Sequence, residues 1–130
     1  MATAPAFAAT PRRSSIAIST ANTARDGTGT IPTVFTAGAS GSRIERIRIM
    51  GVGTVTAGIV RLFLHDGSTF TLFDEILVAA TTPSGTVIGW KVDIDCSYNG
   101  NALILPTSHS LRASTHNAET FHVHAIGADF

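Results

Sequence analysis

The sequence has few of the residues that build covalent or metal-stabilised folds: it contains one cysteine, one tryptophan and one tyrosine among 130 residues. With Cys96 alone, an intrachain disulfide is impossible and a multi-cysteine zinc site is excluded. No stretch approaches the roughly 18 apolar residues that a membrane helix requires. The first residues also lack the basic and apolar segments of a signal peptide. The sequence therefore predicts a soluble chain, made in the cytoplasm, that has no membrane contact.

Lysine is also nearly absent, because Lys91 is the single lysine among nine cationic residues and the rest are arginines. The planar guanidinium is weakly hydrated and binds carboxylates through two hydrogen bonds, and arginine is enriched where protein surfaces meet. Charged residues make up only 14% of the chain, and its net charge is zero. A chain with so little charge has weak protection against association. We expect a homo-oligomer or a subunit of a larger assembly.

The composition and patterning predict an all-β fold. The chain contains 12 glycines and 5 prolines, β-branched residues are abundant, and no segment shows the apolar spacing of an amphipathic helix. Alternation and turn signals predict about eight antiparallel strands in a two-sheet sandwich, jelly-roll-like as the first choice and immunoglobulin-like as the second. The expected strands cover residues 14–20, 32–37, 42–50, 59–65, 70–79, 87–95, 103–106, 110–114 and 119–126.

The chain divides into two parts. Residues 1–13 are mainly alanine, threonine and proline, with Phe7 as the one large apolar group. This composition predicts an extended N-terminal arm with little to bury against its own domain. Residues 14–130 form the predicted sandwich domain. Within it, the Asp66-Gly67 turn predicts a hairpin, and the apolar run before that turn predicts a central strand covered on both faces.

The residue pattern of segment 42–50 predicts which face of the strand each side chain occupies. Arginine and isoleucine alternate from Arg46 to Ile49, which places Arg46 and Arg48 on one face of a strand and the isoleucines on the other. Ile44 does not share this parity, which predicts a bulge near Glu45.

A second alternating segment, residues 87–95, predicts that Ile88 and Trp90 share a buried face and that Trp90 anchors the core. Asp93 and Asp95 would lie on the opposite face. We interpret these carboxylates as partners for arginine, since two ligands on a strand do not make a calcium site.

Several segments, taken together, resemble a group of small tailed-phage virion proteins. The matching segments are turns and strand ends: residues 20–30, 34–38, 41–44, 58–63, 66–67, 105–106, 110–115 and 117–121. The resemblance covers about residues 20 to 130. The proteins of this group are similar to capsid decoration, or cement, proteins and to small tail-associated proteins. It implies a shared fold and a virion role, and it assigns no catalytic residue.

From this resemblance we expect a capsid decoration protein on the outside of the virion. It would bind the phage major capsid protein and bridge its subunits, and it would form a homo-oligomer, for which the resemblance implies a trimer. Phe7 would anchor the arm on a neighbour, and Arg12 and Arg13 would pair with capsid carboxylates. Arg46 and Arg48 would form a second partner-binding surface. A tail or baseplate protein is the first alternative, and a carbohydrate-binding host-attachment module is the second.

Other kinds of site find weaker support. His122 and His124 are expected on one face of a strand, where two imidazoles could share a metal ion, but the spacing demands no third ligand and we predict no metal site. The Gly38–Gly41 segment lacks the spacing of a hydrolase nucleophile elbow, and no βαβ unit supports a dinucleotide site. We therefore predict no enzyme activity and no cofactor. Zero net charge and the single tyrosine argue against nucleic-acid binding.

Overall fold

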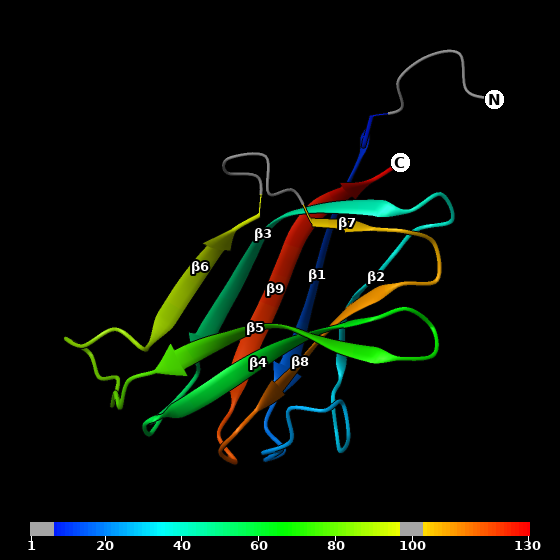
Figure 1. Cartoon of the computed structure of the whole chain (residues 1–130). Coiled ribbons are helices and arrows are strands. Elements are labelled where there is room, and N and C mark those ends of the chain that lie inside the picture. Colours follow the sequence, from blue (N-terminus) through cyan, green and yellow to red (C-terminus); the bar gives the residue numbers. More distant parts are fainter. Residues whose placement is uncertain (1–6, 97–102) are drawn as a thin grey trace.

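The computed structural model describes residues 7–96 and 103–130, and in these ranges the chain forms nine β-strands (Figure 1). They are β1 (Thr10–Ile18), β2 (Thr33–Thr36), β3 (Ser42–Gly51), β4 (Gly58–His65), β5 (Phe70–Val78), β6 (Lys91–Asp95), β7 (Leu103–Leu105), β8 (Ser110–Thr115) and β9 (Phe121–Asp129).

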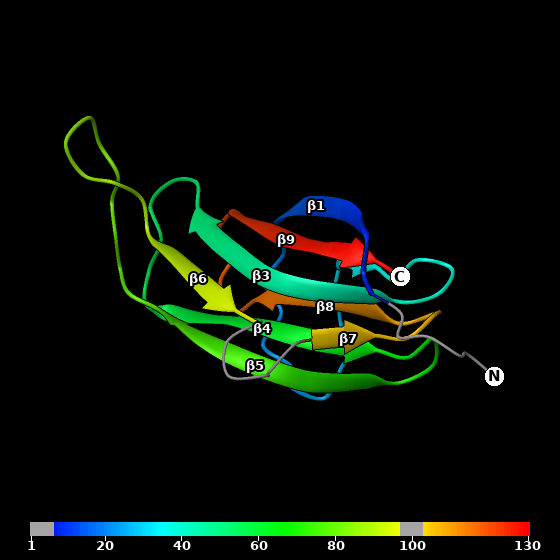
Figure 2. The same ribbon diagram turned by 90° about the horizontal axis from the view of Figure 1, so that it is seen from above.

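The strands form two sheets that pack face to face, as Figure 2 shows from above. The five-stranded sheet has the order β1-β9-β3-β6, with β7 also paired to β3, and the four-stranded sheet has the order β2-β8-β4-β5. All pairings between these strands are antiparallel. The predicted all-β, two-sheet antiparallel sandwich is thus confirmed, and the pairing of β1 with β9 and of β2 with β8 is compatible with a jelly-roll-like winding.

The core lies between the sheets, and on β3 beyond its bulge and on β9 it is built from every second residue. On β3, Ile47 and Ile49 are fully buried, and on β9 so is Val123. Leu62 of β4 and Leu111 of β8 meet them from the four-stranded sheet in the same buried cluster. Burial of a large aliphatic side chain contributes about 1.5–3 kcal/mol, so this alternation fixes which face of each strand is left for solvent.

The predicted bulge on β3 is confirmed, because the register with β9 shifts between Ile44 and Arg46. Glu45 is the extra residue. It allows Ile44 and Ile47 to lie in the same core although their spacing is three residues. Without the bulge, one of the two isoleucines would be exposed.

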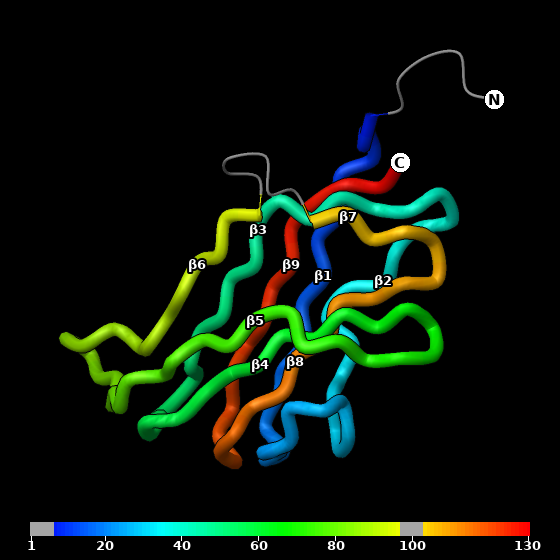
Figure 3. Tube along the Cα trace, viewed as in Figure 1, coloured from blue at the N-terminus to red at the C-terminus, as the bar shows by residue number. Residues whose placement is uncertain are grey.

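The hairpin around Asp66-Gly67 is also confirmed, since β4 pairs with β5 from His65 and Phe70 outward. As expected, β4 is covered on both faces: Phe63 is fully buried and even Arg61 is only 3% exposed. Arg61 Nε donates to Glu75 on β5 at 3.0 Å. The segment between β1 and β2, which folds back at one end of the sandwich in Figure 3, contributes the carbonyl of Asn22 at 3.4 Å from the Arg61 guanidinium.

Two strands, β1 and β6, begin four residues from the expected position. The first strand begins at Thr10 instead of residue 14, so residues 10–13 of the predicted arm pair with β9. Pro11 is tolerated there because β1 is an edge strand of its sheet.

The strand expected over residues 87–95 begins only at Lys91, after a turn in which the Ser84 amide donates to the carbonyl of Val87. The prediction that Ile88 is buried is therefore wrong, and its side chain is 72% exposed. Trp90 is partly buried against the core, with its ring edge-to-face on Phe121 at 5.7 Å between centroids. It packs beside the strand and not within its alternation.

Candidate functional site

The outward side chains of β1, β9, β3 and β6 form three rows across the five-stranded sheet, and we call this surface the Arg face. Read from β1 to β6, the rows are Arg13, Ile126, Arg46 and Asp95; Ser15, His124, Arg48 and Asp93; and Ala17, His122, Met50 and Lys91. Since the other side of each strand is held in the core, these side chains have no alternative to pointing outward.

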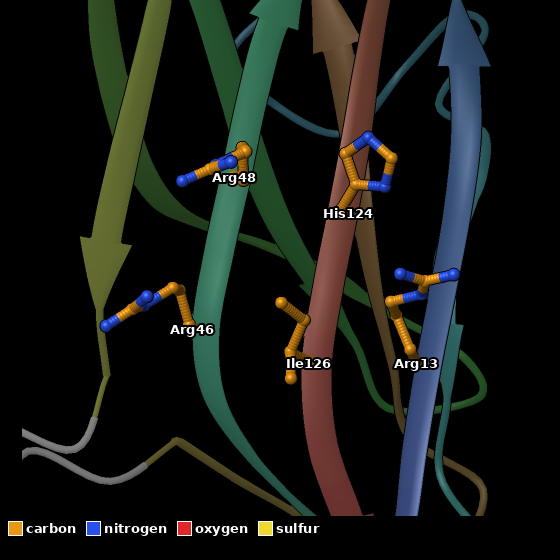
Figure 4. A pocket seen from close by; sticks show the side chains of 5 residues that line it. All are labelled: Arg13, Arg46, Arg48, His124 and Ile126. Atoms are coloured by element: carbon orange, nitrogen blue, oxygen red, sulfur yellow. The ribbon is translucent and has the colours of Figure 1, made fainter.

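A hollow of about 300 Å³ lies over the middle of this face, lined by Arg13, Arg46, Arg48, His124 and Ile126. Figure 4 shows how three neighbouring strands contribute to it: Arg46 and Arg48 come from β3 on one side of β9, and Arg13 comes from β1 on the other. His124 and Ile126 form the strip between them. A second, smaller hollow adjoins it where Glu45 and Asp95 border Arg46 and Ile126.

Arg48 is held by a carboxylate of the next strand. Its Nε donates to Asp93 Oδ1 at 2.7 Å and its Nη2 to Asp93 Oδ2 at 3.0 Å. This pair raises the pKa of Arg48 and lowers the pKa of Asp93 through the hydrogen bonds they share. The two side chains are 46% and 40% exposed, so the pair adds little to stability. It confirms Asp93 as a partner for arginine.

Arg13 and Arg46 differ from Arg48. Among the residues that the structure describes, neither makes a side-chain hydrogen bond or an ion pair. Both residues line the hollow, and in Figure 4 the Arg46 guanidinium is directed toward β6. Partial burial, then the charges of His122, Arg13 and Arg48, lower the pKa of His124. His124 is therefore largely neutral near pH 7, and the positive potential of the hollow comes from its arginines.

The structure brings together three of the five partner-binding residues that the sequence singled out: Arg13, Arg46 and Arg48. Arg12 points to the opposite side of β1, where its Nη1 donates to Asp129 at 3.0 Å and its guanidinium lies 4.1 Å from the centroid of the Phe35 ring. Phe7 lies before β1 with 78% of its side chain exposed. Arg12 thus has a partner within the chain, and Phe7 has the exposure that an anchor for another chain requires.

Sequence reasoning missed the roles of His124 and Ile126 in lining the hollow, and placed Arg13 in the arm. Arg13 faces Ile126 across the β1–β9 pairing, although the two residues are far apart in the chain. No local pattern could show that contact. Residues 10–13, Thr-Pro-Arg-Arg, show no alternation of apolar and polar side chains, so no local signal in the sequence marks the start of β1.

The histidine pair lies as expected, with His122 and His124 on the same face and ring centroids 6.5 Å apart. Within residues 7–96 and 103–130, no group of three or more histidine, cysteine, aspartate or glutamate side chains could hold a metal ion. In the same ranges, no helix is long and apolar enough to cross a membrane.

The chain matches no protein-family model and no curated protein sequence. Among solved structures, it is similar to one described as a pentameric capsid protein isolated from metagenomic phage sequences, with a TM-score of 0.42 and 16% sequence identity. The match covers 89% of this chain but only 61% of the other. Because a TM-score below 0.5 does not establish a shared fold, the function proposed below rests on the surface and the sequence of this chain.

Proposed function

We propose that this protein is a non-enzymatic structural component of a phage virion, and specifically a decoration protein on the outer surface of the assembled head. Its partner is the major capsid protein, whose subunits it bridges. The sequence segments that resemble small phage virion proteins support a virion role. The Arg face supports binding to another protein, and it is the observation that carries the proposal.

The Arg face has the composition of a protein-binding surface. It combines exposed arginines with apolar side chains, since Met50 is 36% and Ile126 is 39% exposed. Arginine and methionine are enriched in protein interfaces, whereas lysine is depleted. The face is built on paired strands and is therefore rigid, so binding orders few groups and costs little conformational entropy.

A second group of exposed apolar side chains supports self-association. Leu77 near the end of β5 is 76% exposed, and Val87 and Ile88 in the following loop are 48% and 72% exposed. This loop extends beyond the two sheets in Figure 2. Apolar groups of this size on an edge strand and a projecting loop favour contact with another copy, and the trimer implied by the sequence resemblance would use them. Many weak bridges over a closed lattice then add up to stabilise the shell.

The number of copies per particle tests the head location. In virions of the phage that encodes the chain, densitometry of a protein gel gives the ratio of this protein to the major capsid protein. A decoration protein requires on the order of hundreds of copies, whereas a tail or baseplate ring requires about six or twelve. The low count would overturn the head location in favour of the tail alternative. The sugar-binding alternative is weak because Trp90, which would have to stack on a sugar ring, packs against Phe121.

A further inference from the structure

We infer that the hollow of the Arg face is a binding site for a carboxylate side chain, carried by an extended acidic segment of the partner protein. The inference rests on the proposed function insofar as it names the chemistry of the partner at the Arg face. It adds a defined site and a ligand class: a glutamate or aspartate that has an apolar neighbour.

The first argument is the geometry of the cations. Arg13 and Arg46 stand on either side of Ile126 in one row of the face, so two strand spacings of about 4.8 Å separate their backbones. Both long side chains line the same hollow between them. Figure 4 shows Arg46 extended toward β6, so a carboxylate held above Ile126 would receive hydrogen bonds from Arg13 and, once the long Arg46 side chain turns toward β9, from Arg46 as well. Neither guanidinium has an ion-pair partner among the described residues.

The second argument is that the face already binds a carboxylate in this manner. Arg48 holds Asp93 through two hydrogen bonds of 2.7 and 3.0 Å. Fork-shaped pairing of this kind is typical of a guanidinium that faces two oxygens of a carboxylate or a phosphate. Arg46, two residues before Arg48 on the same face of β3, presents the same chemistry to a ligand from outside.

The third argument separates a carboxylate from a nucleic-acid backbone. Four cationic side chains on and beside the face are offset by three carboxylates: Arg13, Arg46, Arg48 and Lys91 against Glu45, Asp93 and Asp95. A continuous phosphate chain leaving the hollow toward β6 would meet that acidic rim and be repelled. A single carboxylate placed between Arg13 and Ile126 would not extend along this rim. The volume of about 300 Å³ is at the lower limit of ligand pockets, which suits one or two side chains.

The fourth argument concerns the apolar part of the ligand. Ile126 forms the floor of the hollow and is 39% exposed. An apolar side chain beside the acidic residue would cover it, and removal of that surface from water would add about 25 cal/mol for each Å². Alternating acidic and apolar residues occur naturally in an extended segment, where every second side chain faces the same way.

His124 provides a spectroscopic report on the occupied site. The charged and titratable groups that face it are Arg13 from β1, Arg46 and Arg48 from β3, His122 on its own strand, and Asp93 of β6 through Arg48. Two of the causes that lower the pKa of His124 are the charges of Arg13 and Arg48. A bound carboxylate would offset these charges, so the pKa of His124 should rise on binding.

The test is an NMR titration of the full-length protein with a blocked peptide, acetyl-Thr-Glu-Ile-Glu-Thr-amide. Its matched control has glutamine at both glutamate positions. We expect the glutamate peptide to shift the Nε–Hε signals of Arg13 and Arg46, to raise the pKa of His124, and to bind at least tenfold more tightly than the glutamine peptide. Because a rise in the pKa of His124 links binding to proton uptake, binding should strengthen as the pH falls toward the lowered pKa of His124, as long as the glutamates remain ionised.

Variants assign the effect to the hollow. Arg46→Gln should lower the affinity for the glutamate peptide at least fivefold. Arg25→Gln removes the same charge from the segment between β1 and β2, where Arg25 pairs with Glu75 of β5 at 2.6 Å, and should leave peptide affinity unchanged. Equal affinity for both peptides, or an equal loss in the two variants, would overturn the site. Tighter binding of a six-nucleotide oligothymidylate than of the glutamate peptide would overturn the ligand class.

This result is independent of the copy number on the virion. Peptide binding at the hollow together with a low copy number would leave the carboxylate site in place and overturn only the head location. A high copy number with no peptide binding would leave the head location in place and overturn the carboxylate site.

Discussion

Charge reversal of both Arg46 and Arg48 tests whether the Arg face holds the protein on the particle. Each change to glutamate removes a guanidinium and adds a carboxylate at the same place. If the partner supplies carboxylates, like charges then meet in the interface. Coupling energies of close interfacial charge pairs are about 1.5–7 kcal/mol, so we expect attachment to weaken by several kcal/mol at moderate salt.

The cost to the fold is much smaller, and the structure gives its source. Arg46 makes no ion pair among the described residues, whereas Arg48 loses two hydrogen bonds to Asp93. That pair is 46% and 40% exposed, and exposed pairs contribute about 0.2–1 kcal/mol. For a domain of this size, a loss of about 1 kcal/mol lowers the melting temperature by about 3–5 °C, so the melting temperature should fall by that amount at most. The variant should therefore remain folded at 25 °C.

The assay mixes the folded double variant with particles that lack the protein, sediments them and measures the bound copies. Arg25→Glu is the control, since it reverses a charge in the segment between β1 and β2, next to Glu75 of the other sheet, and should bind like the wild type. An exchange variant, Arg48→Asp with Asp93→Arg, restores the pair within the chain and separates the cost to folding from the cost to attachment. Wild-type occupancy by the folded Arg46→Glu, Arg48→Glu variant would refute the interface and leave the Arg face as a solvated surface.

Three further changes test the fold around this face. Arg61→Met removes a buried guanidinium that donates to Glu75 and to the carbonyl of Asn22. Glu75 keeps its pair with Arg25, so we expect a loss of about 1–3 kcal/mol from the groups left without a donor and a lower urea midpoint; an unchanged midpoint would contradict a stabilising role for the Arg61 hydrogen bonds. Deletion of residues 2–9 should leave the melting temperature nearly unchanged, whereas deletion of residues 2–13 removes the first residues of β1 and should lower it. Hydrogen bonds from a serine hydroxyl and an arginine lower the pKa of Asp129. The ionised carboxylate therefore contributes to the free energy of unfolding above pH 4, and this contribution is lost as the pH falls through the lowered pKa. Asp129→Asn should make the urea midpoint less dependent on pH between pH 5 and pH 2.

The sequence predicted features that lie within one strand or one hairpin. The alternation from Arg46 to Ile49 and the bulge at Glu45 are both present, because a buried face imposes a period of two and any departure from it must be absorbed by an extra residue. The Asp66-Gly67 hairpin is present for a similar local reason: Gly67 adopts a φ of 97° that a side chain would oppose.

The features that sequence missed depend on which strands become neighbours. The burial of Arg61 follows from the position of β4 inside its sheet and from the segment between β1 and β2 that covers it. The place of Arg13 in the hollow follows from the pairing of β1 with β9. Ile88 was assigned to the core because alternation was extended four residues too far, across a turn that leaves the sheet. Local periodicity contains no information on these long-range pairings.

The abundance of arginine in the sequence overstates how many arginine side chains are available to bind another protein. Five of the eight arginines form ion pairs within the chain: Arg12, Arg25, Arg43, Arg48 and Arg61. A sixth, Arg112, donates to Ser110 and lies over the Phe70 ring. Most guanidinium groups therefore already have a partner within this chain. Arg13 and Arg46 remain, and both line the same hollow although they come from different strands. Two arginine side chains are thus the ones expected to bind a partner. The single substitution Arg46→Gln tests this expectation more sharply than any change in the total charge of the protein.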